Sequence, residues 1–102
     1  MDPIRIELER SGGVAGISLR SSIDTGALPP DEAQDIARLV DRIEFADLAR
    51  RPHRPTRGAD RFQYDLTVQQ GATRYRLSLP EGAIPTELKP LLERLIARAK
   101  GG

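Results

Sequence analysis

Residues 61–79 read RFQYDLTVQQGATRYRLSL, two runs of alternating apolar and polar residues with one glycine between them. The apolar residues of each run share one parity: Phe62, Tyr64, Leu66 and Val68, then Tyr75, Leu77 and Leu79. Period-two alternation is typical of a strand with one buried and one solvated face. Because Gly71 accepts the positive φ of a tight turn, the stretch predicts an antiparallel hairpin.

A second hairpin is expected at the start of the chain. Residues 3–10 alternate in the same way, and Ser11-Gly12-Gly13 ends that strand. Val14, Ile17 and Leu19 then predict a second strand, with a bulge or close backbone approach at Gly16. Residues 21–30 are rich in Ser, Asp, Thr, Gly and Pro, a composition that predicts a loop.

Two helices are expected to cover the apolar face of these strands. Ile36, Val40 and Ile43 have helical spacing and predict a helix over about residues 30–44. A last helix is expected to begin near Lys89 rather than earlier, since Pro90 fits only a first helical turn. The order ββαββα predicts a single α+β domain over residues 1–102: a four-stranded antiparallel sheet with two helices on one face.

Composition excludes several classes of function. The 102 residues contain no Cys and one His, so Cys-based zinc sites, disulfides and His-rich metal sites are absent, and no cofactor is expected. The 16 Lys and Arg nearly balance the 15 Asp and Glu, which argues against a general attraction to nucleic acid or acidic membranes. No signal peptide or membrane-spanning run is evident, so a cytoplasmic, soluble protein is expected unless export uses another route.

No catalytic constellation is present, and we expect a protein that is not an enzyme. A hydrolytic triad needs a nucleophile oriented by a His held by an acid, and His53 is the only candidate base. Residues 11–16 are glycine-rich, but they lie between two expected strands and lack the Lys-Ser/Thr ending of a phosphate-binding loop. A hairpin turn is the better interpretation of that segment.

Three segments carry a family resemblance. They read ERSGGVAGI at residues 9–17, DRFQYDLTV at residues 60–68, and Pro-x-x-Leu-x-Pro-Leu-Leu at residues 85–92. In this order and spacing they resemble the emfourin family, small proteinaceous inhibitors of thermolysin-like zinc metallopeptidases. The resemblance implies a binding module that blocks a protease of the same cell through exposed loops in the active-site cleft. It implies no catalysis, and we expect a monomer when the chain is free.

Leu28 is the first candidate contact with such a protease. The enzymes implied by the resemblance favour a bulky aliphatic or aromatic side chain just after the cleaved bond. Leu28 is such a side chain, and it lies between Ala27 and Pro29, whose ring restricts the backbone conformation. Alternatively, Leu28 packs on Ala33 or Ile36 as a hydrophobic staple before the helix.

The arginine-rich loop 50–61 is the second candidate. Gly58 permits close approach of the backbone to an active-site rim, or is an ordinary loop glycine. Arg57 and its neighbouring arginines either steer the domain toward an acidic cleft or only keep the loop soluble. His53 is either a ligand for the enzyme's zinc or a solvated loop residue.

Two other functions compete with inhibition. Loop 50–61 is also compatible with a small nucleic-acid or protein-binding module. The sequence argues against nucleic acid as a partner, because the strands offer no exposed aromatic platform and Glu7, Glu9 and Asp65 repel phosphate. A structural domain that forms oligomers would leave an apolar strip along an edge strand or the last helix.

Overall fold

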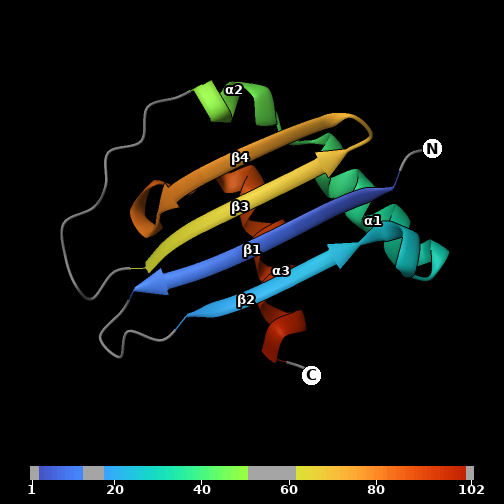
Figure 1. Cartoon of the computed structure of the whole chain (residues 1–102), viewed down its shortest axis with the longest axis horizontal. Helices are drawn as coiled ribbons and strands as arrows, with labels where there is room; N and C mark the ends of the chain where they lie inside the picture. Colours follow the sequence, from blue (N-terminus) through green and yellow to red (C-terminus); the bar gives the residue numbers. More distant parts are fainter. Residues whose placement is uncertain (1–2, 13–17, 51–61, 101–102) are drawn as a thin grey trace.

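Four antiparallel strands form one sheet in the order β2-β1-β3-β4, shown in Figure 1. The computed structural model describes residues 3–12, 18–50 and 62–100. The strands are β1 (Ile4–Gly12), β2 (Leu19–Asp24), β3 (Phe62–Gln70) and β4 (Thr73–Pro80). The α-helices are α1 (Pro30–Asp41), α2 (Phe45–Arg50) and α3 (Lys89–Lys100). Short 3-10 turns are η1 (Thr25–Ala27), η2 (Glu81–Ala83) and η3 (Thr86–Leu88). The predicted α+β class is confirmed.

The hairpin predicted from residues 61–79 is present as β3 and β4. Gln70 pairs with Thr73, so the turn contains two residues, Gly71 and Ala72. Gly71 has φ 60°, and no residue other than glycine in the described ranges has a positive φ. A positive φ at the first central position alone is the pattern of a type II′ turn, whose twist matches that of the flanking strands. The glycine therefore sets the register of the hairpin.

The second strand differs from its prediction. It runs from Leu19 to Asp24, so residues 21–24 belong to the sheet and the loop predicted over residues 21–30 is wrong there. An edge strand with one solvated face tolerates Ser21 and Ser22, because only one row of backbone hydrogen bonds ties it to its neighbour. Only Ile23 of this strand is buried. The bulge predicted at Gly16, with Val14 and Ile17, lies outside the described residues.

The helices and the sheet enclose an aliphatic core. Helix α1 ends at Asp41 rather than residue 44, and the chain forms a separate helix, α2, that packs against β4. Phe45 of α2 stacks on Tyr75 of β4 with ring centroids 6.0 Å apart. Helix α3 begins at Lys89 after the 3-10 turn η3, as Pro90 predicts. None of the helices in the described ranges is long and apolar enough to cross a membrane.

Core side chains come from all the α-helices and strands. The most completely buried are Ile6, Leu48, Leu66, Val68, Leu79, Leu88, Leu91 and Leu95. The opposite face of the sheet carries the polar residues of each strand and is open to solvent. The fold therefore leaves two kinds of surface for a partner: this open face and the irregular segments at the ends of the strands.

Candidate functional site

Residues 24–30, which we call the 24–30 corner, turn the chain from the end of β2 into α1. The segment begins with the 3-10 turn η1. Leu28 then has extended backbone, with φ −99° and ψ 155°, and Pro29 has φ −56° and ψ 150°. Helix α1 starts at Pro30. Two extended residues are thus presented between a tight turn and a helix.

Hydrogen bonds fix the corner on both sides. An Asp24 carboxylate oxygen accepts from the backbone N–H of Gly26 at 2.9 Å. The Thr25 hydroxyl oxygen accepts from the backbone N–H of Ile4 at 2.8 Å, across 21 residues of sequence. The Leu28 N–H donates to the Thr25 carbonyl at 3.3 Å. The backbone is therefore ordered before any partner arrives.

The side chains of the corner differ in exposure. Ala27 and Pro29 are exposed, whereas Leu28 is half-buried and packs against the hydrophobic core. Part of the Leu28 side chain therefore rests on the core and part remains accessible to solvent, and its contact with a protease stays a prediction. The corner offers an apolar side chain on an extended backbone, flanked by a small residue and a proline.

An apolar groove of 650 Å³ adjoins the corner. Its walls include Pro3 and Ile4 from the start of β1, Thr25 and Gly26 from the corner, and Ala33 and Ala37 from α1. The volume falls within the ~300–1,000 Å³ typical of ligand pockets. The groove and the corner form one continuous surface, because Thr25 and Gly26 belong to both.

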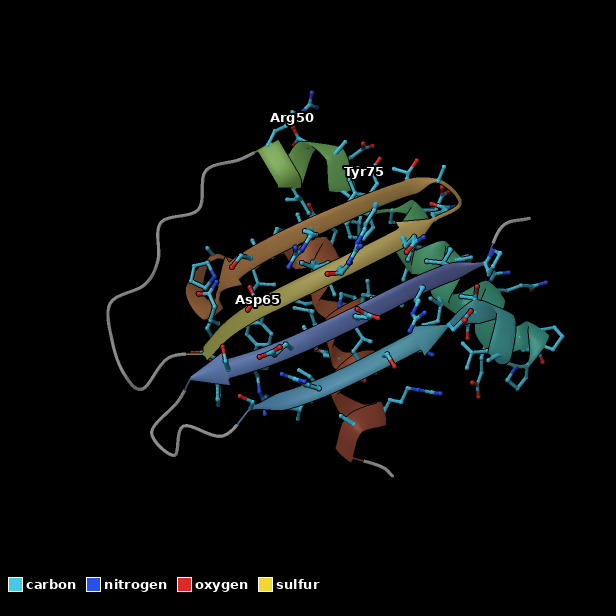
Figure 2. The ribbon with its side chains drawn as sticks, viewed as in Figure 1. Arg50, Asp65 and Tyr75 are labelled. Carbon is cyan, nitrogen blue, oxygen red and sulfur yellow. The ribbon has the colours of Figure 1, made fainter. Side chains whose placement is uncertain are left out.

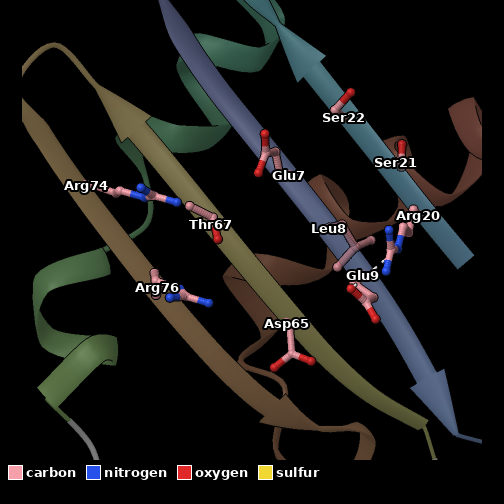
Figure 3. Close-up of a pocket in the computed structure, with 10 residues that line it drawn as sticks. All are labelled: Glu7, Leu8, Glu9, Arg20, Ser21, Ser22, Asp65, Thr67, Arg74 and Arg76. Carbon is pink, nitrogen blue, oxygen red and sulfur yellow. Dashed lines mark ion pairs between the residues drawn. The ribbon is translucent and has the colours of Figure 1, made fainter. Parts of the chain in front are cut away.

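The open face of the sheet is a second, polar surface. It forms a concavity of 520 Å³, drawn in Figure 3. Its acidic side chains are held by neighbours: Glu9 pairs with Arg20 at 3.5 Å, and the Asp65 carboxylate accepts from the Ser78 hydroxyl at 2.7 Å. Ion pairs at such exposed positions contribute little stability. Mixed charge without an aromatic lining does not suit a nucleic-acid platform.

Arg74 and Arg76 are the cations of this face that have no ion pair within the described residues. They extend from β4 over the neighbouring strand (Figure 3). Glu7 lines the same concavity and pairs with Arg5 at 3.3 Å. Opposite charges alternate along this face, so it presents no single-sign field for steering a charged partner.

The predicted residues His53, Arg57 and Gly58 lie outside the described residues, as do Arg51 and Arg54. The described flanks of that loop are Arg50 and Phe62. Arg50 is exposed at the end of α2 and projects away from the sheet (Figure 2). Phe62 opens β3, where the Arg10 guanidinium lies 4.4 Å from the centroid of its ring.

Neither flank of the loop lies near the 24–30 corner. Phe62 pairs with Gly12 at one end of β1, whereas Asp24 pairs with Arg5 at the other end. A nine-residue strand spans about 26 Å between its first and last residues. Helix α2 packs on β4, the edge opposite β2 (Figure 1). The structure therefore does not bring the flanks of loop 50–61 together with Leu28.

Asp24 and Thr25 are absent from the sequence-based prediction, although they build the corner. An Asp two residues before a Gly is the available signal, because its carboxylate can accept from the glycine N–H. The Thr25 contact has no local signal, since its partner lies at the start of β1. The described residues hold no group of three or more His, Cys, Asp or Glu side chains suited to a metal ion.

Comparison with known proteins gives one finding. No curated protein and no solved structure matches the chain. A family model described as Emfourin matches residues 8–96, which is most of the chain. The match covers β1 from Leu8 onward, β2, the 24–30 corner, α1, α2, the central hairpin and α3 up to Ile96. Emfourin membership indicates a protease-inhibitor-type protein. The chain therefore belongs to the emfourin family.

Proposed function

We propose that this protein inhibits a thermolysin-like zinc metallopeptidase by inserting the 24–30 corner into the active-site cleft. The observation that carries the proposal is the extended backbone of Leu28 and Pro29, held at an accessible turn by hydrogen bonds. Proteases and other peptide-binding proteins hold extended segments through main-chain hydrogen bonds and side-chain pockets. Leu28 would fill the apolar pocket that follows the cleaved bond.

Preorganisation supports a role in inhibition. Immobilising one flexible side chain or loop residue on binding costs roughly 0.5–1.5 kcal/mol. The backbone of the corner is already restricted in the free protein by the hydrogen bonds of Asp24 and Thr25 and by the rings of Pro29 and Pro30. Less conformational entropy is therefore lost when the complex forms. The adjoining apolar groove would accept a side chain from the rim of the enzyme.

The second proposed contact is loop 50–61. Gly58 would allow close approach to the enzyme, Arg57 would bond a carboxylate, and His53 would approach the zinc. Because the flanks of this loop lie away from the corner, we propose it as a separate contact whose loss leaves the Leu28 contact in place. The proposed partner is a protease of the same cytoplasm, met by a monomeric inhibitor.

The test is a titration of the purified protein into a thermolysin-like metallopeptidase, with hydrolysis of a short peptide as the readout. We expect hydrolysis to fall to near zero close to an equimolar ratio. The variant Gly58→Leu tests the contact of loop 50–61 without altering the 24–30 corner. If the loop lies at the interface, the added side chain overlaps the enzyme and inhibition weakens by roughly tenfold or more. A protein that leaves hydrolysis untouched at a large molar excess contradicts the proposed function.

A further inference from the structure

We infer that Asp24 and Thr25 are positioning residues that stop the protease from cutting the 24–30 corner. They hold η1 in a turn, so that extended backbone resumes only at Leu28 and Pro29, after the turn. The inference rests on the proposed function and adds to it a reason why the protein remains an inhibitor rather than becoming a substrate.

The bond at risk is the one between Ala27 and Leu28. With Leu28 in the pocket that follows the cleaved bond, hydrolysis adds the oxygen of water to the Ala27 carbonyl carbon. The bond to the Leu28 nitrogen breaks, and that nitrogen takes up a proton as it leaves. Catalysis requires the reacting atoms to be aligned, and a bound substrate is extended on both sides of its bond.

The residues before this bond are not extended. Thr25 to Ala27 form a 3-10 turn, and the leaving nitrogen, that of Leu28, donates its hydrogen to the Thr25 carbonyl at 3.3 Å. Because the turn includes Ala27, the chain bends away from an extended path at the residue that directly precedes the Ala27–Leu28 bond. The Ala27 carbonyl is therefore held out of the position that attack by water needs.

Two hydrogen bonds from outside the turn maintain this shape. The Asp24 carboxylate holds the Gly26 N–H, and the Thr25 hydroxyl holds the Ile4 N–H of β1. A Cβ on Gly26 would lie 3.2 Å from the Asp24 carboxylate, so the turn is closely packed there. A three-residue 3-10 turn is marginal alone, because its own hydrogen bonds are few and poorly aligned.

The experiment compares tether variants during long incubation with the protease. Thr25→Val and Asp24→Ala each remove an acceptor, while Thr25→Ser and Asp24→Asn keep an oxygen in place as matched controls. Intact-mass spectrometry locates any cut, and peptide hydrolysis reports inhibition over the same period. Thermal melting of each variant establishes that it is folded.

We expect the unaltered protein and both controls to stay intact and to inhibit throughout. Each acceptor-deleted variant is expected to be cut between Ala27 and Leu28 several-fold faster, and the double variant roughly tenfold faster or more, with inhibition fading as the cut product accumulates. Resistance to cleavage in Thr25→Ser and Asp24→Asn, together with its loss in folded Thr25→Val and Asp24→Ala, would distinguish a positioning role from a general loss of stability.

Two results would overturn the inference while leaving the proposed function standing. One is a folded double variant that inhibits without being cut. The other is cleavage of the variants only at bonds outside the 24–30 corner. Failure of the unaltered protein to inhibit would overturn the proposed function, and the inference with it.

Discussion

Leu28→Ala is expected to weaken inhibition of a thermolysin-like protease by roughly 30-fold to 1,000-fold. Truncation of a central interface side chain typically costs about 2–4 kcal/mol of binding free energy. Leu28 is the large apolar side chain of the 24–30 corner, and it stands on extended backbone between two exposed residues. The inhibition constant, from peptide hydrolysis at several inhibitor concentrations, measures this effect.

Leu39→Ala is the matched control for that variant. Leu39 is also half-buried and also packs against the core, but it lies on α1, more than two turns beyond Pro30. Both substitutions remove the same atoms from a comparable environment, so both should lower stability by about 1–2 kcal/mol. Equal inhibition by the two variants would contradict the assignment of Leu28 to the interface.

Leu66→Ala is expected to lower the free energy of unfolding by about 2–5 kcal/mol. Leu66 is 1% exposed and lies on the interior strand β3, opposite Leu8 of β1 and Leu77 of β4. The cavity left behind cannot collapse easily, because ordered strands hold both neighbours. For a chain of this size each 1 kcal/mol shifts Tm by roughly 4–8 °C.

Urea unfolding followed by circular dichroism measures that change, and Gln69→Ala is its control. Gln69 lies on the same strand but is exposed on the open face, so its truncation should change stability by less than about 0.5 kcal/mol. A loss below about 1 kcal/mol for Leu66→Ala would show that the sheet does not supply the centre of the core.

Hydrophobic periodicity predicted most of the fold from sequence. The alternation in residues 62–79 gave the central hairpin, and Pro90 gave the start of α3. The sequence predicts a loop where β2 continues, because Ser21, Ser22 and Asp24 are turn-forming residues and Ile23 is the only large apolar residue among residues 21–24. Helix α2 has six residues, which is too short for helical spacing to distinguish it from a covering loop.

The candidate site was predictable only in part. A leucine beside two prolines marked the corner, because the fixed φ of proline can be read from sequence. The tether between Thr25 and Ile4 could not be read, since it depends on how β1 and β2 pair. Nor does sequence order reveal that Asp24 and Phe62 lie at opposite ends of the sheet.

This separation has a consequence for inhibition. The 24–30 corner ends the edge formed by β2, whereas the flanks of loop 50–61 lie at α2 and at the far end of β3 (Figure 1). A protease that contacts both must extend along the sheet as well as enclose Leu28. Substitutions in the two regions should then have additive effects on binding, since residues farther apart than about 10 Å seldom couple.

The most direct measurement is nuclear magnetic resonance of the ¹⁵N-labelled inhibitor, free and bound to the unlabelled protease. We expect the amide signals of Thr25, Gly26, Ala27 and Leu28 to shift or broaden most strongly, and those of Glu7 and Arg76 on the open face to change little. Changes confined to the open face, with the signals of the 24–30 corner unaltered in an inhibited complex, would contradict the account.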